Sequence, residues 1–128
     1  MTEPDDALQE ARAQVLHDLG TRGLDVAAAV SLLDDAVTAR RWWVEQWPAG
    51  AEFVTCLVAQ DVQEALLDTV GRWPLCTLVH EADDDPDGAH DVAHDVELRV
   101  SPDLGPAPHW VCESSGVVVS PVGALPPG

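Results

Sequence analysis

Apolar residues recur at helical spacing through the first half of the chain. Between residues 4 and 19 they follow one another every three or four positions, as Leu8, Ala11, Val15 and Leu19. Acidic Asp5 and Asp6 at the start suit the positive end of a helix dipole. The pattern predicts a helix over residues 4–19, which Gly20 ends.

A second amphipathic segment covers residues 26–47. Proline cannot continue a helix, so we expect this segment to stop at Pro48, and Asp25 is the expected N-cap. The predicted apolar face consists of Val26, Val30, Leu33, Val37 and Val44, widened by Ala29, Leu32, Ala36, Trp43 and Trp47. A face this wide predicts burial against other parts of the chain.

A third helix is predicted to follow Gly50. Residues recurring every four positions are Val54, Val58, Val62, Leu66 and Val70. The segment "FVTCLV" alone is compatible with a strand, but the helical period continues past it, so we predict a helix that Gly71 ends and that holds Cys56 in the core.

From Trp73 onward the period changes to that of β-strands. "LCTLVH" predicts a short strand, and "HDVELRV" alternates with Val96, Leu98 and Val100 on one face. "HWVC" and "GVVVS", separated by "ESSG", predict a hairpin. The expected fold is therefore α+β, with three helices followed by a small antiparallel sheet of three to four strands.

At 128 residues the chain is expected to form a single domain. Its predicted parts are a helical part over residues 4–71, a β part with an acidic loop over residues 73–122, and a flexible tail over residues 123–128. No apolar run approaches the ~20 residues that span a bilayer. The acidic start "MTEPDDALQE" is unlike a signal peptide, so we expect a cytoplasmic protein with reduced cysteines.

The formal net charge of −17 changes the range of partners to consider. Phosphate binding needs clustered Lys and Arg, so this charge argues against direct binding to nucleic acid or to an anionic membrane. A basic protein partner or a cation is compatible with the charge, and the simpler interpretation is a generally acidic cytosolic protein.

Two pairs of residues match zinc-ligand spacing, namely Cys76-x3-His80 and His109-x2-Cys112. Zinc takes four N or S ligands in a tetrahedron, and two turns can supply them. In a regular strand, however, Cys76 and His80 would lie ~13 Å apart, so the site needs a bend between them. The alternative interpretation is two core cysteines and two surface histidines.

A second histidine pair, His90-x3-His94, lies in the acidic stretch "DDDPDGAHDVAHDV". Either histidine is an alternative ligand in place of His109. The simpler interpretation is a pair of solvated histidines in the acidic loop 81–95.

Three tryptophans gather at the end of the second predicted helix. Helical spacing places Trp43 and Trp47 on one face, which predicts core packing, whereas Trp42 points elsewhere beside Arg40 and Arg41. An exposed Trp/Arg patch is typical of a protein-binding hot spot. The alternative is that these residues join the helices to the sheet.

Catalytic motifs are not found: there is no nucleophile elbow, no Gly-rich phosphate loop, and no lysine. We therefore expect a non-enzymatic, acidic protein-binding or regulatory module, with zinc as a candidate stabilising ion. One alternative is an acidic mimic of nucleic acid that antagonises a basic protein. A third is a small metal-dependent hydrolase with Glu113 or Glu81 as its base.

The segments "AQDVQEALLDTVGRWPLC", "HWVC" and "SPVGAL" together resemble a group of small actinobacterial proteins of unknown function. The shared pattern is W-P-x-C with a following His, then W-x-C and V-G-x-L, over roughly the C-terminal half. The resemblance implies that the following residues lie together: Trp73, Pro74, Cys76, His80, Trp110 and Cys112.

Overall fold

The computed structural model of the protein describes residues 4–76, 97–113 and 115–127. Helices α1 (Pro4–Gly20), α2 (Ala27–Gln46) and α3 (Val54–Leu67) come first, with a short 3-10 helix, η1 (Pro48–Phe53), between the last two. Strands β1 (Leu98–Ser101), β2 (His109–Cys112) and β3 (Val118–Pro121) follow. The expected α+β class, three helices followed by an antiparallel sheet, is confirmed.

The helix boundaries differ in detail from those expected. Helix α2 has Val26 as its N-cap, without a side-chain capping bond, so the prediction of Asp25 as the cap is wrong. Because the helix starts one residue later than expected, Asp25 lies outside the capping position. Pro48 starts η1, and α3 proper begins only at Val54. Periodicity alone does not distinguish this tight first turn from an α-helix.

The sheet has the order β1-β2-β3, with both pairs antiparallel. Leu98 and Val100 are buried, and they face Cys112 and Trp110 across the β1–β2 pair. The expected alternation in "HDVELRV" is thereby confirmed for these two residues, whereas Val96 lies outside the described residues.

Of the strand expected in "LCTLVH", the described part forms a single bridge. Leu75 pairs with Glu97, and the amide of Leu98 donates to the carbonyl of Pro74 at 2.7 Å. The continuation, residues 77–80, lies outside the described residues, as does the predicted acidic loop 81–95.

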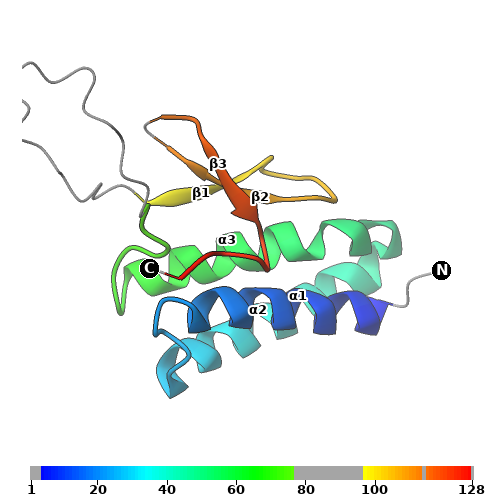
Figure 1. Ribbon diagram of the computed structural model, residues 1–128. Coiled ribbons are helices and arrows are strands. Elements are labelled where there is room, and N and C mark those ends of the chain that lie inside the picture. The colour runs from blue at the N-terminus through cyan, green and yellow to red at the C-terminus, as the bar shows by residue number, and fades with distance from the viewer. Residues whose placement is uncertain (1–3, 77–96, 114, 128) are drawn as a thin grey trace, which may run out of the picture.

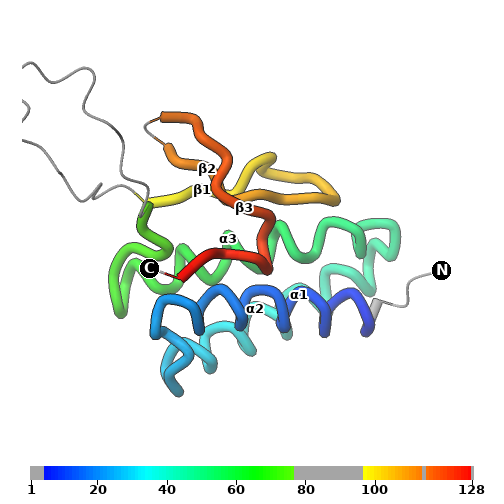
Figure 2. Tube along the Cα trace, in the orientation of Figure 1, coloured from blue at the N-terminus to red at the C-terminus, as the bar shows by residue number. Residues whose placement is uncertain are grey.

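The sheet lies over α3, and α1 and α2 complete the helical layer beneath it (Figure 1). The segment after β3 returns from the sheet and runs along the helices (Figure 2). One hydrophobic cluster joins the two layers, and it includes the predicted stripe Leu8, Ala11, Val15 and Leu19 of α1. Val26, expected on the buried face of α2, is instead exposed at the helix start.

The connection between α2 and α3 is built around aromatic rings. Trp43 and Trp47 meet edge to face at 5.2 Å between ring centroids, and Phe53 lies 5.8 Å from Trp47. Trp43 packs against the core as expected, but Trp47 is 45% exposed. The reason is that Trp47 caps the helix with a non-helical backbone, so helical spacing no longer directs its side chain.

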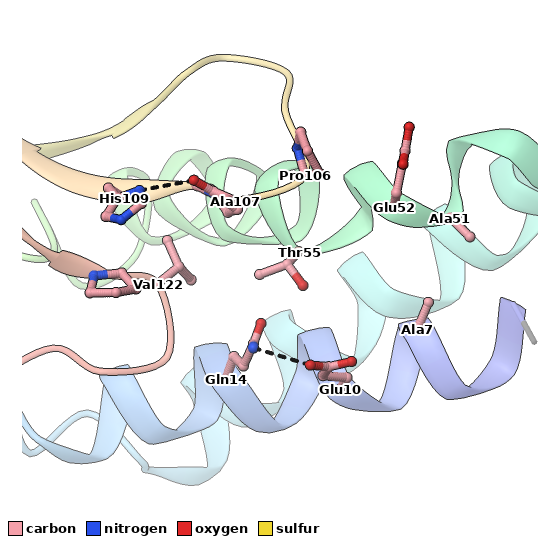
Figure 3. Close-up of a pocket in the computed structure, with 12 residues that line it drawn as sticks. Ala7, Glu10, Gln14, Ala51, Glu52, Thr55, Pro106, Ala107, His109 and Val122 are labelled. Carbon is pink, nitrogen blue, oxygen red and sulfur yellow. Dashed lines mark hydrogen bonds between the residues drawn. The ribbon is translucent and has the colours of Figure 1, made fainter. Parts of the chain in front are cut away.

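Among the hollows on the surface of the described part, two lie beside residues singled out above. The first, which we call the loop hollow, has a volume of about 510 Å³ and lies between α1, the η1–α3 junction and the β1–β2 loop (Figure 3). The second, the tryptophan groove, has a volume of about 470 Å³ and lies between α2 and α3. Its lining includes Leu32, Ala36, Ala39, Trp42, Trp43 and Ala65.

Gly50 allows the close approach in the aromatic connection. A Cβ atom at this position would lie 2.6 Å from the Trp43 ring and 2.7 Å from the Trp47 ring. We expect Gly50→Ala to lower the free energy of unfolding by about 1–3 kcal/mol, because the rings must shift to admit the methyl group. Urea denaturation followed by tryptophan fluorescence measures this change.

Gly20→Ala is the matched control, because its added Cβ would find its nearest neighbour at 3.8 Å, in ordinary contact with Asp25. Equal stability of the Gly50→Ala variant and the wild-type protein would contradict the tight packing of this connection.

Candidate functional site

A buried carboxylate joins the helical layer to the β part. Asp18, near the end of α1, has no exposed surface. Its Oδ2 accepts hydrogen bonds from Trp110 Nε1 and from the amide of Gly123, both at 2.7 Å, and its Oδ1 accepts one from the amide of Leu125 at 3.0 Å. His17 Nδ1 lies 2.9 Å from the same Oδ1. A charge removed from water needs such a set of donors.

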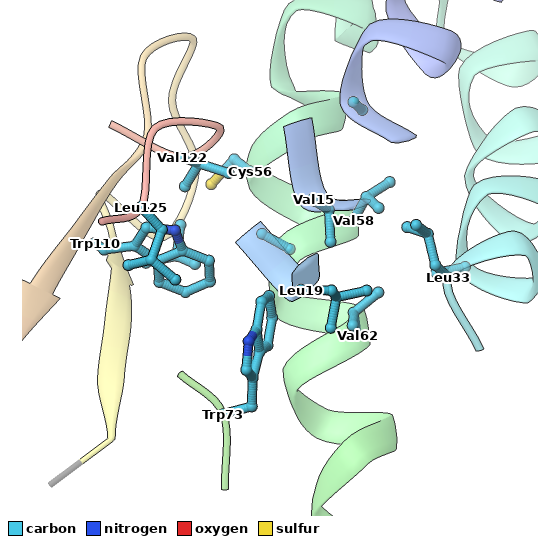
Figure 4. Close-up of a cluster of buried hydrophobic side chains, with 14 of the residues drawn as sticks. Val15, Leu19, Leu33, Cys56, Val58, Val62, Trp73, Trp110, Val122 and Leu125 are labelled. Atoms are coloured by element: carbon cyan, nitrogen blue, oxygen red, sulfur yellow. The ribbon is translucent and has the colours of Figure 1, made fainter. Parts of the chain in front are cut away.

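These donors come from β2 and from the segment that follows β3. We expected a flexible tail from residue 123, but Gly123 and Leu125 are bonded to Asp18, and Leu125 is buried beside Trp110 (Figure 4). The "HWVC" and "SPVGAL" segments are therefore held by one side chain of α1. Sequence reasoning missed Asp18, although its place three residues after Val15, within the apolar stripe, is the available signal.

A second polar side chain, Gln63 of α3, holds the other end of the sheet. Its Nε2 lies 2.7 Å from the carbonyl oxygen of Leu98, 3.1 Å from that of Trp73 and 3.3 Å from Glu97 Oε1. The two tryptophans thus fixed, Trp73 and Trp110, meet edge to face at 5.3 Å (Figure 4). Sequence analysis also missed Gln63, which interrupts the apolar face of α3 between Ala59 and Leu66.

The described members of the motif pattern lie in one core. The hydrophobic cluster contains Trp73, Cys76, Trp110 and Cys112, and Pro74 is buried as well. His80 lies outside the described residues. The pattern therefore brings together two structural tryptophans and two buried thiols.

The predicted zinc ligands are only partly placed. Cys76 and Cys112 are buried, and none of the chain's three cysteines forms a disulfide. Residues three apart on a regular strand point to opposite faces, so β2 does not direct His109 and Cys112 toward one point. Across residues 4–76, 97–113 and 115–127, no group of three or more His, Cys, Asp or Glu side chains is arranged to hold a metal ion.

His109 instead faces the loop hollow, where its Nδ1 lies 2.9 Å from the carbonyl oxygen of Ala107. The alternative ligands His90 and His94 lie outside the described residues, as His80 does. The four-ligand zinc site therefore stays a prediction.

The predicted tryptophan and arginine patch is present in part. Trp42 is 66% exposed on α2 and borders the tryptophan groove. Arg40 binds Asp61 of α3 through two hydrogen bonds of 2.6 and 2.8 Å, and its guanidinium carbon lies 5.7 Å from the Trp43 ring centroid. Arg41 pairs with Asp5 of α1. Both arginines are thus engaged within the chain, although Arg41, like Trp42, is exposed.

In the described part, burial raises the pKa of one thiol and of one carboxyl group. Burial raises the pKa of the Cys56 thiol, whose Sγ lies 3.1 Å from the carbonyl oxygens of Pro102 and Asp103, so this thiol stays protonated at neutral pH. Burial also raises the pKa of Glu97, and the nearby Glu113 adds to this shift. Glu113 is exposed at the end of β2, and Glu81, the other predicted base, lies outside the described residues.

Asp18→Asn tests the buried carboxylate. Both oxygens of Asp18 accept hydrogen bonds from N–H groups. In the asparagine variant an NH₂ group replaces one of these oxygens, so it would face an N–H donor and the hydrogen bond would be lost. We expect the free energy of unfolding to fall by about 2–4 kcal/mol, measured by urea denaturation.

Asp34→Asn is the matched control for this change. Asp34 pairs with Arg12 at 2.7 Å, and the two side chains are 53% and 37% exposed, so loss of this pair should cost at most about 1 kcal/mol. Equal losses for the two variants would show that Asp18 does not join the two layers as described.

Comparison with known proteins adds a family but no activity. No curated protein and no solved structure matches the chain. In the described part of the chain, no helix is both long and apolar enough to span a membrane. The model of one family matches residues 4–122, which is most of the chain. The protein therefore belongs to the family described as a domain of unknown function, DUF8819.

Proposed function

We propose that this protein is a small, non-enzymatic protein-binding module whose partner docks on the tryptophan groove. The observation that carries the proposal is the 66% exposure of Trp42 at the edge of an apolar groove. A tryptophan ring covers a large area and loses little conformational entropy on binding, which is why exposed tryptophans are frequent hot spots.

The surroundings of Trp42 favour a rigid docking surface. The groove floor is formed by small side chains of two packed helices, namely Ala36, Ala39 and Ala65. The two-pronged Arg40–Asp61 pair ties α2 to α3 at this point, so the groove is formed before a partner arrives. A preformed groove reduces the entropic cost of binding.

The charge of the chain favours a partner with a basic surface. The net charge is −17, and within the described residues arginines pair with carboxylates as Arg12–Asp34, Arg40–Asp61 and Arg41–Asp5. Asp35 also lines the groove. An acidic surface of this kind accelerates the encounter with a basic protein. We propose that this encounter takes place in the cytoplasm.

Trp42→Ala is the direct test. A partner is captured on the wild-type protein, purified, and titrated against both proteins by calorimetry. We expect the variant to bind at least about 30-fold more weakly, because a hot-spot residue contributes about 2 kcal/mol or more. Its stability should be unchanged, since the ring lies mostly in solvent.

Val118→Ala serves as the control, because Val118 is an equally exposed apolar residue on β3, away from the groove. If Trp42→Ala and Val118→Ala bind the partner as tightly as the wild-type protein, the groove is not the docking site.

Mimicry of nucleic acid is a second candidate, favoured by the surplus of carboxylates over the paired arginines. It makes a different prediction in the same titration. Exposed charges are screened over about 10 Å at 0.1 M salt, so the affinity of a mimic should collapse as salt rises and should not depend on Trp42.

Zinc binding in the β part is a further element of the proposal. Cys76 and Cys112 lie in one buried cluster, and thiolates are preferred zinc ligands. Because His109 faces the loop hollow, the set that we propose is Cys76, His80 and Cys112, with His90 or His94 as the fourth ligand. Such an ion would stabilise the fold of a small β part.

Native mass spectrometry after zinc supply tests this element. We expect one bound zinc in the wild-type protein, in Cys56→Ser and in His109→Ala, and none in Cys112→Ser. Of the three substituted residues, Cys112 alone is a ligand in the proposed set. Absence of zinc from the wild-type protein, or its retention in Cys112→Ser, contradicts the site.

A further inference from the structure

The loop hollow is separate from the tryptophan groove. It is bounded by α1 on one side, by the start of α3 on the other, and by the β1–β2 loop above (Figure 3). Its volume of about 510 Å³ lies within the range of small-ligand sites.

Hydrogen-bond acceptors line this hollow from different elements. Glu10 comes from α1 and Thr55 from the first turn of α3, whereas His109 of β2 lies toward the opposite end of the hollow (Figure 3). Glu52 of η1 also lines the hollow, and its carboxylate points away from Thr55 (Figure 3). The Thr55 side chain points toward α1, where Gln14 Nε2 donates to Glu10 Oε1 at 3.5 Å. The residues that line the hollow include no lysine or arginine.

The state of His109 adds a further acceptor. A carbonyl oxygen only accepts hydrogen bonds, so the 2.9 Å contact with Ala107 places a proton on Nδ1. In the neutral ring, the other nitrogen, Nε2, then carries a lone pair. The polar part of the hollow therefore suits a ligand that is rich in donors and positively charged.

The remaining lining is apolar. Pro106 and Pro108 of the β1–β2 loop and Val122, which follows β3, line one part of the hollow. Ala7 of α1 and Ala51 of η1 line another part. These groups offer contact to a short hydrocarbon chain but no hydrogen bonds. A suitable ligand thus carries an apolar stem and a cationic head.

We propose that the loop hollow binds the side chain of an arginine presented by a basic protein partner. Guanidinium has five N–H donors in a rigid fork and no acceptor, which matches the carboxylate of Glu10 and the hydroxyl of Thr55 on two neighbouring elements. Its three methylene groups pack on apolar walls while the head stays polar. Glu10 is the principal charge partner, and Glu52 attracts the approaching cation.

The proposal deepens the protein-binding function, since an arginine comes from a partner, but it concerns a separate surface. Its test therefore uses a small probe and does not require the partner. The probe is N-acetyl-arginine amide, and the neutral probe of nearly the same shape is N-acetyl-citrulline amide. Binding is followed by amide chemical shifts in the full-length protein.

With the arginine probe we expect saturable shifts at Thr55, Glu52 and His109, with millimolar affinity. Citrulline amide should bind at least about fivefold more weakly, because a charge-assisted hydrogen bond is roughly twice as strong as a neutral one. Glu10→Gln should weaken the arginine probe at least about fivefold, and Glu52→Gln by a smaller factor.

Glu64→Gln is the control, since it removes the same charge from an exposed position on α3 that does not line the hollow. Shifts spread evenly over the acidic surface, or equal affinities in Glu10→Gln and Glu64→Gln, would overturn the proposal and indicate general attraction of cations. Equal binding of the citrulline probe would also overturn it. If the arginine site is overturned but Trp42→Ala still loses partner binding, the tryptophan groove remains supported as the docking site.

Discussion

The burial of one carboxylate governs how the two layers of this protein meet. An ionised side chain without exposed surface is strongly unfavourable unless donors surround it. Asp18 obtains them from Trp110 of β2 and from the amides of Gly123 and Leu125. Since these donors lie more than ninety residues away in the sequence, Asp18 is satisfied only when α1, the sheet and the last segment are all in place. That requirement makes the folding of the two parts cooperative.

Gln63 acts in the same way from α3. Its amide bonds the carbonyl groups of Trp73 and Leu98, so the chain leaving α3 and the first strand are fixed to one helical position. Gln60, also on α3, holds the loop between β1 and β2, because its Nε2 donates to the carbonyl of Asp103 at 2.6 Å. Polar side chains within apolar helix faces therefore set the position of a sheet that is too small to do so by its own core.

Because these bonds fix the sheet over α3, the outer surfaces of the helices remain available for other molecules. The tryptophan groove lies on the α2–α3 side, and the loop hollow lies between α1 and the β1–β2 loop. Both have acidic groups at their edges, and the net charge of −17 extends this preference to the whole molecule. We propose that both surfaces bind basic partners, each through a different group.

The sequence alone determined the three helices, the antiparallel strands and the burial of Leu98 and Val100, because local periodicity of apolar residues follows directly from helix and strand geometry. It also indicated that Trp42 differs from its neighbours. Only the tertiary structure decided that Asp18 and Gln63 join the layers and that Arg40 and Arg41 are paired within the chain. Those outcomes depend on contacts between residues distant in sequence, and a single sequence carries no periodic signal for the partner of a polar side chain.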